Sequence, residues 1–280
     1  MDLHVTEFAI DRGVGIARLS RPERGNSWTH RMNAEYRWIM QSFENNPEVR
    51  VIVVTGAGRQ FCTGADFRAL EHHRSDNRDY AEATAGLEMV TPGYGVQAEF
   101  DHELIWHWGL SKPVIAAING ACAGIALALA AFCDLRFAAE GAKITAATAR
   151  LGLPAEYGLS WILPRLVGLA ASTDILFTGR ILLAEEMQAL GFIHQVLPSA
   201  GFEDQVLAKA RAMAASTSPV AVRAAKRQIY AEQLHLLPGT SIEDSKKLTA
   251  QLLKHPDCLE GLSALREKRP PDFLPLDARA

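Results

Sequence analysis

Polar and apolar residues alternate along positions 4 to 19, with the turn sequence Asp11-Arg12-Gly13 in the middle. Alternation with a period of two is typical of strands that bury one face, so this pattern predicts a β-hairpin. The stretch VRVIVVTGAG, residues 49–58, is instead a continuous β-branched run that ends in glycine. Such a run indicates a strand buried on both faces. A helical pattern near residues 30–45 separates the hairpin from this strand.

Strand and helix patterns also alternate farther along the chain. We predict a helix in QAEFDHELIWHWGL (97–110), a buried strand in KPVIAAING (112–120), a helix in AGIALALAAFC (123–133) and a strand in DLRFAAE (134–140). This order implies β-α-β units with parallel strands. The polar segment 68–95 contains many turn-forming residues and is predicted to be a loop.

Helical patterns dominate after Gly179. The segment AEEMQALG precedes a strand-like FIHQVLP, and amphipathic stretches follow at about 201–216, 219–235 and 241–269. We therefore predict an α/β core over residues 1–198 and a helical C-terminal region over residues 199–280.

Composition narrows the range of partners. The 280 residues are 48% hydrophobic and carry a formal net charge of −3, which gives no basic surface for nucleic acid or anionic lipid. The N-terminus lacks the features of a signal peptide, and the longest apolar run, GIALALAAFC, is about half of what spans a bilayer. We expect a cytoplasmic protein with neither nucleic acid nor membrane as a partner.

The cysteines and histidines show no spacing typical of metal ligands. Nine histidines are scattered, and the four cysteines lack a CxxC pair and lie mostly among apolar residues, which favours reduced buried thiols. We expect no bound metal.

Three common catalytic motifs are incomplete. The sequence GAGRQF has Phe61 where the dinucleotide fingerprint needs its third glycine. Around Ser160, GLSWI has Ile162 where a nucleophile elbow has glycine. No lysine of a phosphate-binding loop follows a glycine-rich turn, so nucleotide-triphosphate and serine-hydrolase chemistry are both disfavoured.

Two glycine-rich turns remain, FCTGADF (61–67) and INGACAGIALALAAFCD (118–134). Each lies where a strand gives way to a helix, so backbone N–H groups are left unpaired there. Two such groups directed at one point would form an oxyanion hole. The alternative, that the glycines only permit tight turns and close packing, fits the residues equally well.

Several motifs in order resemble the crotonase superfamily, also called the enoyl-CoA hydratase/isomerase family. They are LSRPERGNSWTHRM, VTGAGRQFCTGADF, KPVIAAINGACAGIALALAAFCDLRFA, LPRLVG, FTGR, ALGFIHQVLP and EGLSALREKRPPDF, between about residues 5 and 273. The resemblance implies the crotonase (ClpP-like) α/β fold, a spiral of β-β-α units with a helical trimerisation region. It further implies a homotrimer or dimer of trimers, a coenzyme A thioester as substrate, and no permanently bound cofactor.

The resemblance also assigns roles to residues. The backbone N–H groups of Thr63 and Ile125 match the pair that holds the thioester oxygen and stabilises an enolate. Lys268 and Phe273 match residues that reach the coenzyme A of a neighbouring subunit. Other positions match the wall of the substrate and coenzyme A site: Arg24, Gly25, Ser27, Ala65, Asp66, Phe67, Gly124 and Trp161.

Three positions depart from the hydratase pattern. Ala128 and Thr148 stand where family hydratases have the two glutamates that hold a water molecule. Glu156 stands where several family isomerases have an acidic residue that acts on the substrate. Among Leu153, Tyr157 and Trp161, a desolvated Glu156 could move one proton between two carbons. Alternatively, Pro154 and Glu156 are only favourable residues for the start of a helix.

The predicted function is therefore double-bond isomerisation of an enoyl-CoA with Glu156 as acid and base. Two alternatives stay open: hydration with Glu156 as the main carboxylate, and a non-catalytic acyl-CoA-binding or RNA-associated family member. Further polar candidates lie in the segment before the second turn: Glu99, Asp101, His102, Glu103 and His107.

Overall fold

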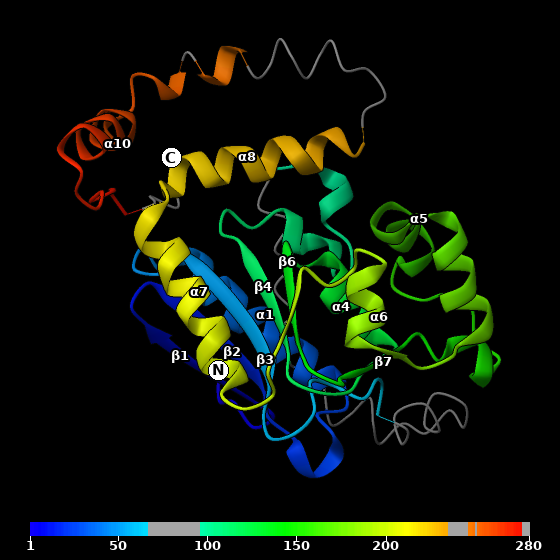
Figure 1. Ribbon diagram of the computed structural model, residues 1–280. Coiled ribbons are helices and arrows are strands. Elements are labelled where there is room, and N and C mark those ends of the chain that lie inside the picture. The colour runs from blue at the N-terminus through cyan, green and yellow to red at the C-terminus, as the bar shows by residue number, and fades with distance from the viewer. Residues whose placement is uncertain (67–95, 235–245, 250, 276–280) are drawn as a thin grey trace.

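A six-stranded sheet forms the centre of the computed structural model, which describes residues 1–66, 96–234, 246–249 and 251–275 (Figure 1). The strand order is β1-β2-β3-β4-β6-β9; β1 pairs antiparallel with β2, and all other neighbours are parallel. The predicted hairpin and buried strands are thus confirmed. The strands are β1 (Thr6–Asp11), β2 (Val14–Leu19), β3 (Val51–Gly56), β4 (Val114–Ile118), β6 (Leu135–Ala139) and β9 (Gln195–Leu197).

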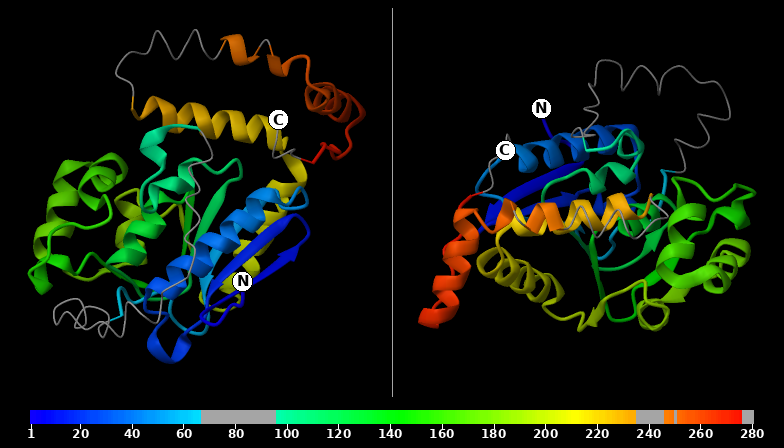
Figure 2. Two further views of the ribbon diagram at one scale, coloured as in Figure 1. Left: turned by 180° about the vertical axis from the view of Figure 1, so that it is seen from behind. Right: turned by 90° about the horizontal axis from the view of Figure 1, so that it is seen from above.

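Helices cover both faces of this sheet (Figure 2). Val51 and Val53 of β3 pack in one cluster with α7 (Phe202–Ser216), whereas Ile52 and Val54 belong to the cluster that contains α1 (His30–Asn45) and α4 (Ile125–Phe132). Successive side chains of a strand point to opposite faces, so the unbroken apolar run of β3 serves both clusters.

A smaller sheet carries the second glycine-rich turn, and Cys62 of the first turn forms an isolated parallel bridge with Cys122 of this sheet. Its order is β5 (Cys122–Ala123), β7 (Lys143–Thr145) and β8 (Leu182–Leu183). The chain between β7 and β8 contains η4 (Thr148–Leu151) and α5 (Leu159–Thr178). Helix α6 (Ala184–Ala189) follows β8 and leads to β9.

Helix α5 has the length and hydropathy of a membrane-spanning segment, the one such helix in the described part of the chain. Gly168 divides it, with φ 78° and ψ 163°, into two parts that each have about ten residues. A membrane span needs about 20 residues of continuous helix. The kink therefore argues against a transmembrane role for α5.

The C-terminal region contains α8 (Pro219–Glu232) and α10 (Pro256–Glu267), shown in yellow-orange and red in Figure 1. The amphipathic stretch predicted at about 241–269 is helical in most of its described part, but the chain leaves the helical conformation at 253–255. His255 caps α10, and Pro256 takes its first position, where a missing N–H costs nothing. The proposed division near residue 198 stays a prediction, although α7 packs directly on the sheet.

The helix predicted over 97–110 is also wrong. Two short 3₁₀ helices occupy it, η2 (Ala98–Phe100) and η3 (Ile105–Trp108), because Leu104 adopts a left-handed φ of 61° that interrupts the helix. His107 is fully buried, 2.8 Å from the Tyr36 hydroxyl, and burial holds its pKa well below 6.5.

The loop predicted over 68–95 lies outside the described residues, and so does Phe67.

Candidate active site

A cavity of about 510 Å³ lies where the two glycine-rich turns meet. An added Cβ at Gly124 would stand only 3.9 Å from the Cα of Gly64, so the turns are in close contact. Eight residues that the sequence assigned to the site line this cavity: Arg24, Ser27, Thr63, Ala65, Asp66, Gly124, Ile125 and Glu156. Residues separated by more than a hundred positions are therefore brought together.

The first turn, residues 62–66, is fixed by backbone pairing with residues 25–28. The N–H of Trp28 donates to the Gly64 carbonyl at 2.7 Å, and the N–H of Asp66 donates to the Trp28 carbonyl at 2.9 Å. This parallel bridge leaves the N–H of Ala65, between them, directed away from the pairing.

An arginine that the sequence did not single out strengthens this arrangement. One terminal nitrogen of Arg21 donates to the Asp66 carboxylate at 3.0 Å and to the Ser27 carbonyl at 2.9 Å. The hydroxyl of Ser27 donates to the same carboxylate oxygen at 3.2 Å. Asp66 is therefore committed to holding the turn, and no sequence signal distinguished Arg21 from its neighbours.

The second turn ends β5 and starts α4. Gly124 has φ 54° and ψ −118°, and its carbonyl accepts the N–H groups of Leu127 and Ala128 at 3.0 and 3.2 Å. Ile125 is the first helical residue, so its N–H has no acceptor within the helix. Among the described residues, none accepts a hydrogen bond from the N–H of Ala65 or Ile125.

The assignment of Thr63 as a donor to the thioester oxygen is not supported. Its N–H donates to the Gly25 carbonyl at 3.0 Å and is thus already engaged. Gly25 permits this contact, because a Cβ there would stand 2.8 Å from the Thr63 side chain. Ala65, expected only to contact coenzyme A, has the available N–H instead.

Glu156 lies before α5, not in it. The helix begins at Leu159, after two residues in the left-handed region, Tyr157 with φ 51° and Gly158 with φ 75°. A Cβ at Gly158 would stand 3.2 Å from Phe132 at the end of α4, so close packing fixes this corner. Pro154 and Glu156 are therefore not helix-start residues, which removes the alternative explanation for the glutamate.

Glu156 is half-buried, lines the cavity, and has no hydrogen-bonding or ion-pair partner for its carboxylate among the described residues. Burial raises the pKa of the neighbouring Tyr157, and the charges of Glu156 and Glu103 raise it further. The other carboxylate on the cavity wall, Asp66, is held by Arg21 and Ser27.

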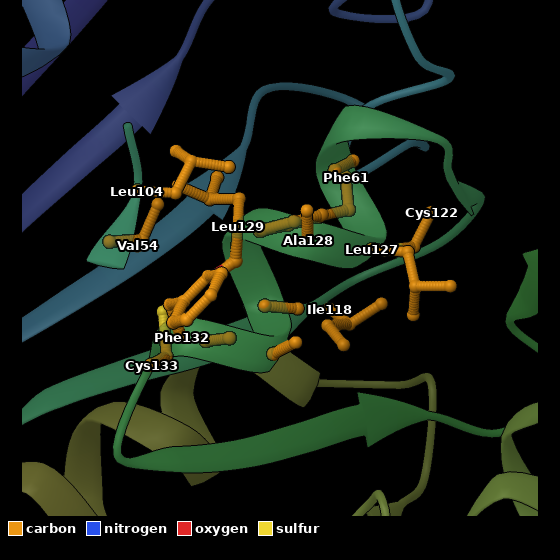
Figure 3. Close-up of a cluster of buried hydrophobic side chains, with 14 of the residues drawn as sticks. Val54, Phe61, Leu104, Ile118, Cys122, Leu127, Ala128, Leu129, Phe132 and Cys133 are labelled. Carbon is orange, nitrogen blue, oxygen red and sulfur yellow. The ribbon is translucent and has the colours of Figure 1, made fainter. Parts of the chain in front are cut away.

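The two positions that carry glutamates in hydratases differ in their surroundings. Ala128 is fully buried in the apolar cluster around α4 and does not line the cavity (Figure 3). Thr148 is 4% exposed and does line it. The wall also includes apolar residues that the sequence did not assign to the substrate: Ala123, Ala146, Ala147, Leu151 and Leu153.

Four described residues assigned to the site do not line this cavity: Gly25, which packs against the Thr63 side chain, and Trp161, Lys268 and Phe273. The Trp161 ring packs near Trp108, with the two ring centroids 5.5 Å apart, and the guanidinium carbon of Arg165 lies 3.8 Å from the centroid of the Trp161 ring. Lys268 ends α10, and Phe273 is buried against Gly261. Their predicted role, at the site of a neighbouring subunit, stays a prediction.

No group of three or more potential metal ligands occurs within residues 1–66, 96–234, 246–249 and 251–275. The expectation that the protein binds no metal stays a prediction.

Comparisons with known proteins show the family of this chain. The family model for enoyl-CoA hydratase/isomerase matches residues 9–275. A probable enoyl-CoA hydratase of Rhodobacter capsulatus is 32% identical over 273 residues, covering 98% of this chain and 99% of the relative. The 1,2-epoxyphenylacetyl-CoA isomerase of Escherichia coli is 32% identical over 267 residues, covering 94% of this chain and 96% of the relative.

Solved structures give the same result. A probable enoyl-CoA hydratase/isomerase from Mycobacterium abscessus superimposes with a TM-score of 0.84 at 27% identity, covering 97% of this chain and 99% of the other. An enoyl-CoA hydratase from Bacillus anthracis gives a TM-score of 0.81 at 28% identity, covering 97% and 99%. The predicted crotonase fold is confirmed, and the chain belongs to the enoyl-CoA hydratase/isomerase family of the crotonase superfamily.

Proposed function

We propose that this enzyme moves the double bond of an enoyl-CoA thioester, with Glu156 as the only group that transfers protons. The observation that carries the proposal is the position of Glu156 on the wall of a cavity that also contains two available N–H groups. Asp66 is held by Arg21, and Ala128 and Thr148 cannot replace a second carboxylate.

In this reaction a 3-enoyl-CoA gives up a proton from C2 to the Glu156 carboxylate. The electron pair of the broken C2–H bond forms a double bond between C1 and C2, and the carbonyl π electrons move onto the thioester oxygen, which gains negative charge. The resulting dienolate is conjugated with the double bond between C3 and C4. The N–H groups of Ala65 and Ile125 stabilise that charge, an effect worth about 3 kcal/mol per donor in other enzymes. Glu156 then returns the proton to C4, which leaves the double bond between C2 and C3.

Hydration is the alternative, with Glu156 as the main carboxylate. In hydration, the site must position a water molecule and remove a proton from it as it adds to C3. The site must then donate a proton to C2. Two acid or base groups normally share that work, and the described wall offers Glu156 alone for it. The names of the relatives include a hydratase and an isomerase, so the preference for isomerisation rests on the residues of the cavity.

A substrate assay tests the assignment. Purified enzyme is mixed with trans-3-hexenoyl-CoA and, separately, with trans-2-hexenoyl-CoA, and the absorbance of the conjugated thioester is followed. We expect absorbance to rise with the 3-enoyl substrate as conjugation forms. Rapid loss of absorbance with 2-hexenoyl-CoA, and formation of 3-hydroxyhexanoyl-CoA by mass spectrometry, would assign hydration instead. Turnover of neither compound would contradict both assignments.

We also propose a homotrimer or a dimer of trimers. Helix α10 exposes Leu259, Leu262 and Leu265, which are 63%, 55% and 78% accessible and recur at the spacing of one helical face. Such an apolar stripe favours contact with another chain.

Light scattering after size-exclusion chromatography should therefore give three or six times the 30.6 kDa chain mass. Changing Leu262 and Leu265 to glutamate should lower that mass to one chain. A wild-type monomer at micromolar concentration would overturn the proposal.

A further inference from the structure

Thr148 contributes a hydroxyl to the same stretch of cavity wall as Glu156. Both come from the segment between β7 and α5, whose other wall residues are Ala146, Ala147, Leu151 and Leu153. The side chains of this stretch are apolar apart from Glu156 and Thr148. The proposed reaction uses the carboxylate of Glu156 and gives no role to the hydroxyl of Thr148.

The hydroxyl of Thr148 has no hydrogen-bond partner among the described residues. The residue as a whole is only 4% exposed. Its hydroxyl oxygen nevertheless keeps some accessible surface, because it is not among the fully buried side-chain atoms that lack a hydrogen-bond partner. The hydroxyl therefore keeps access to the cavity that Thr148 lines. Thr145 shows the contrast, because its hydroxyl donates to the Gly179 carbonyl and accepts the Ala147 N–H, both at 3.1 Å.

The backbone holds Thr148 in a defined place. Ala147, immediately before it, has a left-handed φ of 60°, and the N–H of Leu153 donates to the Thr148 carbonyl at 2.9 Å. A left-handed non-glycine residue costs free energy and persists only where the surroundings impose it. The turn thus presents Thr148 to the cavity despite its conformational cost.

A bound acyl chain would exclude water from this hydroxyl. A plain hydrocarbon offers no replacement, so the hydroxyl would be left buried without a partner, which weakens binding. A chain with an oxygen atom at the right carbon could accept or donate a hydrogen bond, since a threonine hydroxyl does both.

We propose that Thr148 recognises an oxygen on the acyl chain, so that the preferred substrates are acyl-CoA thioesters bearing a hydroxyl, carbonyl or ether oxygen. The inference rests on the proposed function in one respect, that the cavity holds the acyl group of a coenzyme A thioester. It does not require that Glu156 be the base.

Binding without turnover gives the test. Saturated thioesters cannot be isomerised, so calorimetry can compare butyryl-CoA with 2-, 3- and 4-hydroxybutyryl-CoA on wild type, Thr148→Val and Thr148→Ser. Valine keeps the shape but removes the hydroxyl, and serine keeps the hydroxyl. At least one hydroxy isomer should bind wild type more tightly than butyryl-CoA. Thr148→Val should weaken binding of that isomer by about 3- to 10-fold. The same variant should bind butyryl-CoA as tightly as wild type or more tightly, because it removes the hydroxyl that a plain chain leaves without a partner. Thr148→Ser should bind the hydroxy isomer as wild type does.

Two results would overturn the inference, and they differ. If Thr148→Val changes all four affinities alike, the hydroxyl does not recognise an acyl oxygen, although the cavity still binds acyl-CoA. If none of the four thioesters binds wild type, the assignment of the cavity to acyl-CoA fails as well. Butyryl-CoA binding also reports whether the valine variant is folded.

Discussion

Glu156→Gln is expected to lower kcat for 3-enoyl-CoA by about a hundredfold to ten-thousandfold, the range typical of a lost general acid or base. Glutamine preserves the size of the side chain and cannot take a proton at neutral pH. The carboxylate lines the cavity with no partner among the described residues, so its amide analogue should disturb no structural contact. KM should change little, because the thioester is held by other groups. Steady-state kinetics with 3-hexenoyl-CoA measures both constants.

Glu103→Gln is the matched control. This substitution also removes one negative charge near Tyr157, because the charges of Glu103 and Glu156 both raise the pKa of that tyrosine. Unlike Glu156, Glu103 does not line the cavity. It pairs with Arg37 at 2.7 Å and is 45% exposed. Its activity should remain close to wild type. Equal losses in the two variants would show that a general electrostatic effect, rather than proton transfer by Glu156, controls the rate.

Local patterns predicted the central sheet well and the surface helices less well. The run from Val51 to Val54 specifies its strand because every side chain is buried, on one face or the other. The segment 97–110 has helix-forming residues, yet tertiary packing decides its conformation. Trp106 and Trp108 are both buried there, and Leu104 turns the chain at φ 61°. Helical propensity is too weak to resist such packing.

The sequence predicted eight residues that line the cavity, but it did not determine which of their atoms are available to a substrate. Which N–H is available in the first turn depends on pairing with residues 25–28, about 40 positions earlier. That pairing engages Thr63 and leaves Ala65 available, and nothing in FCTGADF distinguishes the two. Similarly, Trp161 occurs in the same short stretch as Glu156, but its indole faces Trp108 instead of the cavity.

A buried ion pair joins the C-terminal region to the core, and its loss should have the largest effect on stability. Asp134, at the start of β6, accepts hydrogen bonds from Lys226 at 2.8 Å, from the Tyr230 hydroxyl at 2.6 Å and from the Val114 N–H at 2.6 Å. Lys226 and Tyr230 belong to α8. The Tyr230 ring also stacks on Trp108, with centroids 4.2 Å apart.

Asp134→Ala should lower the free energy of unfolding by about 3–5 kcal/mol, because it leaves the ammonium of Lys226, 5% exposed, without its counter-charge. Denaturant titration at one fixed protein concentration measures the change. Asp174→Ala is the control: Asp174 pairs with Arg180 at a similar distance of 2.7 Å, but both side chains are well exposed. Solvent screens such pairs, so this variant should lose far less stability.

The double variant Asp134→Leu with Lys226→Met separates the cost of an unpaired charge from the value of the pair itself. Removing both charges replaces the ion pair with apolar contact, which is often neutral or stabilising in a buried site. Most of the stability lost in Asp134→Ala should therefore return. If the double variant is as unstable as the single one, the hydrogen bonds from Tyr230 and Val114 to the carboxylate, rather than the buried charge, hold α8 against the core.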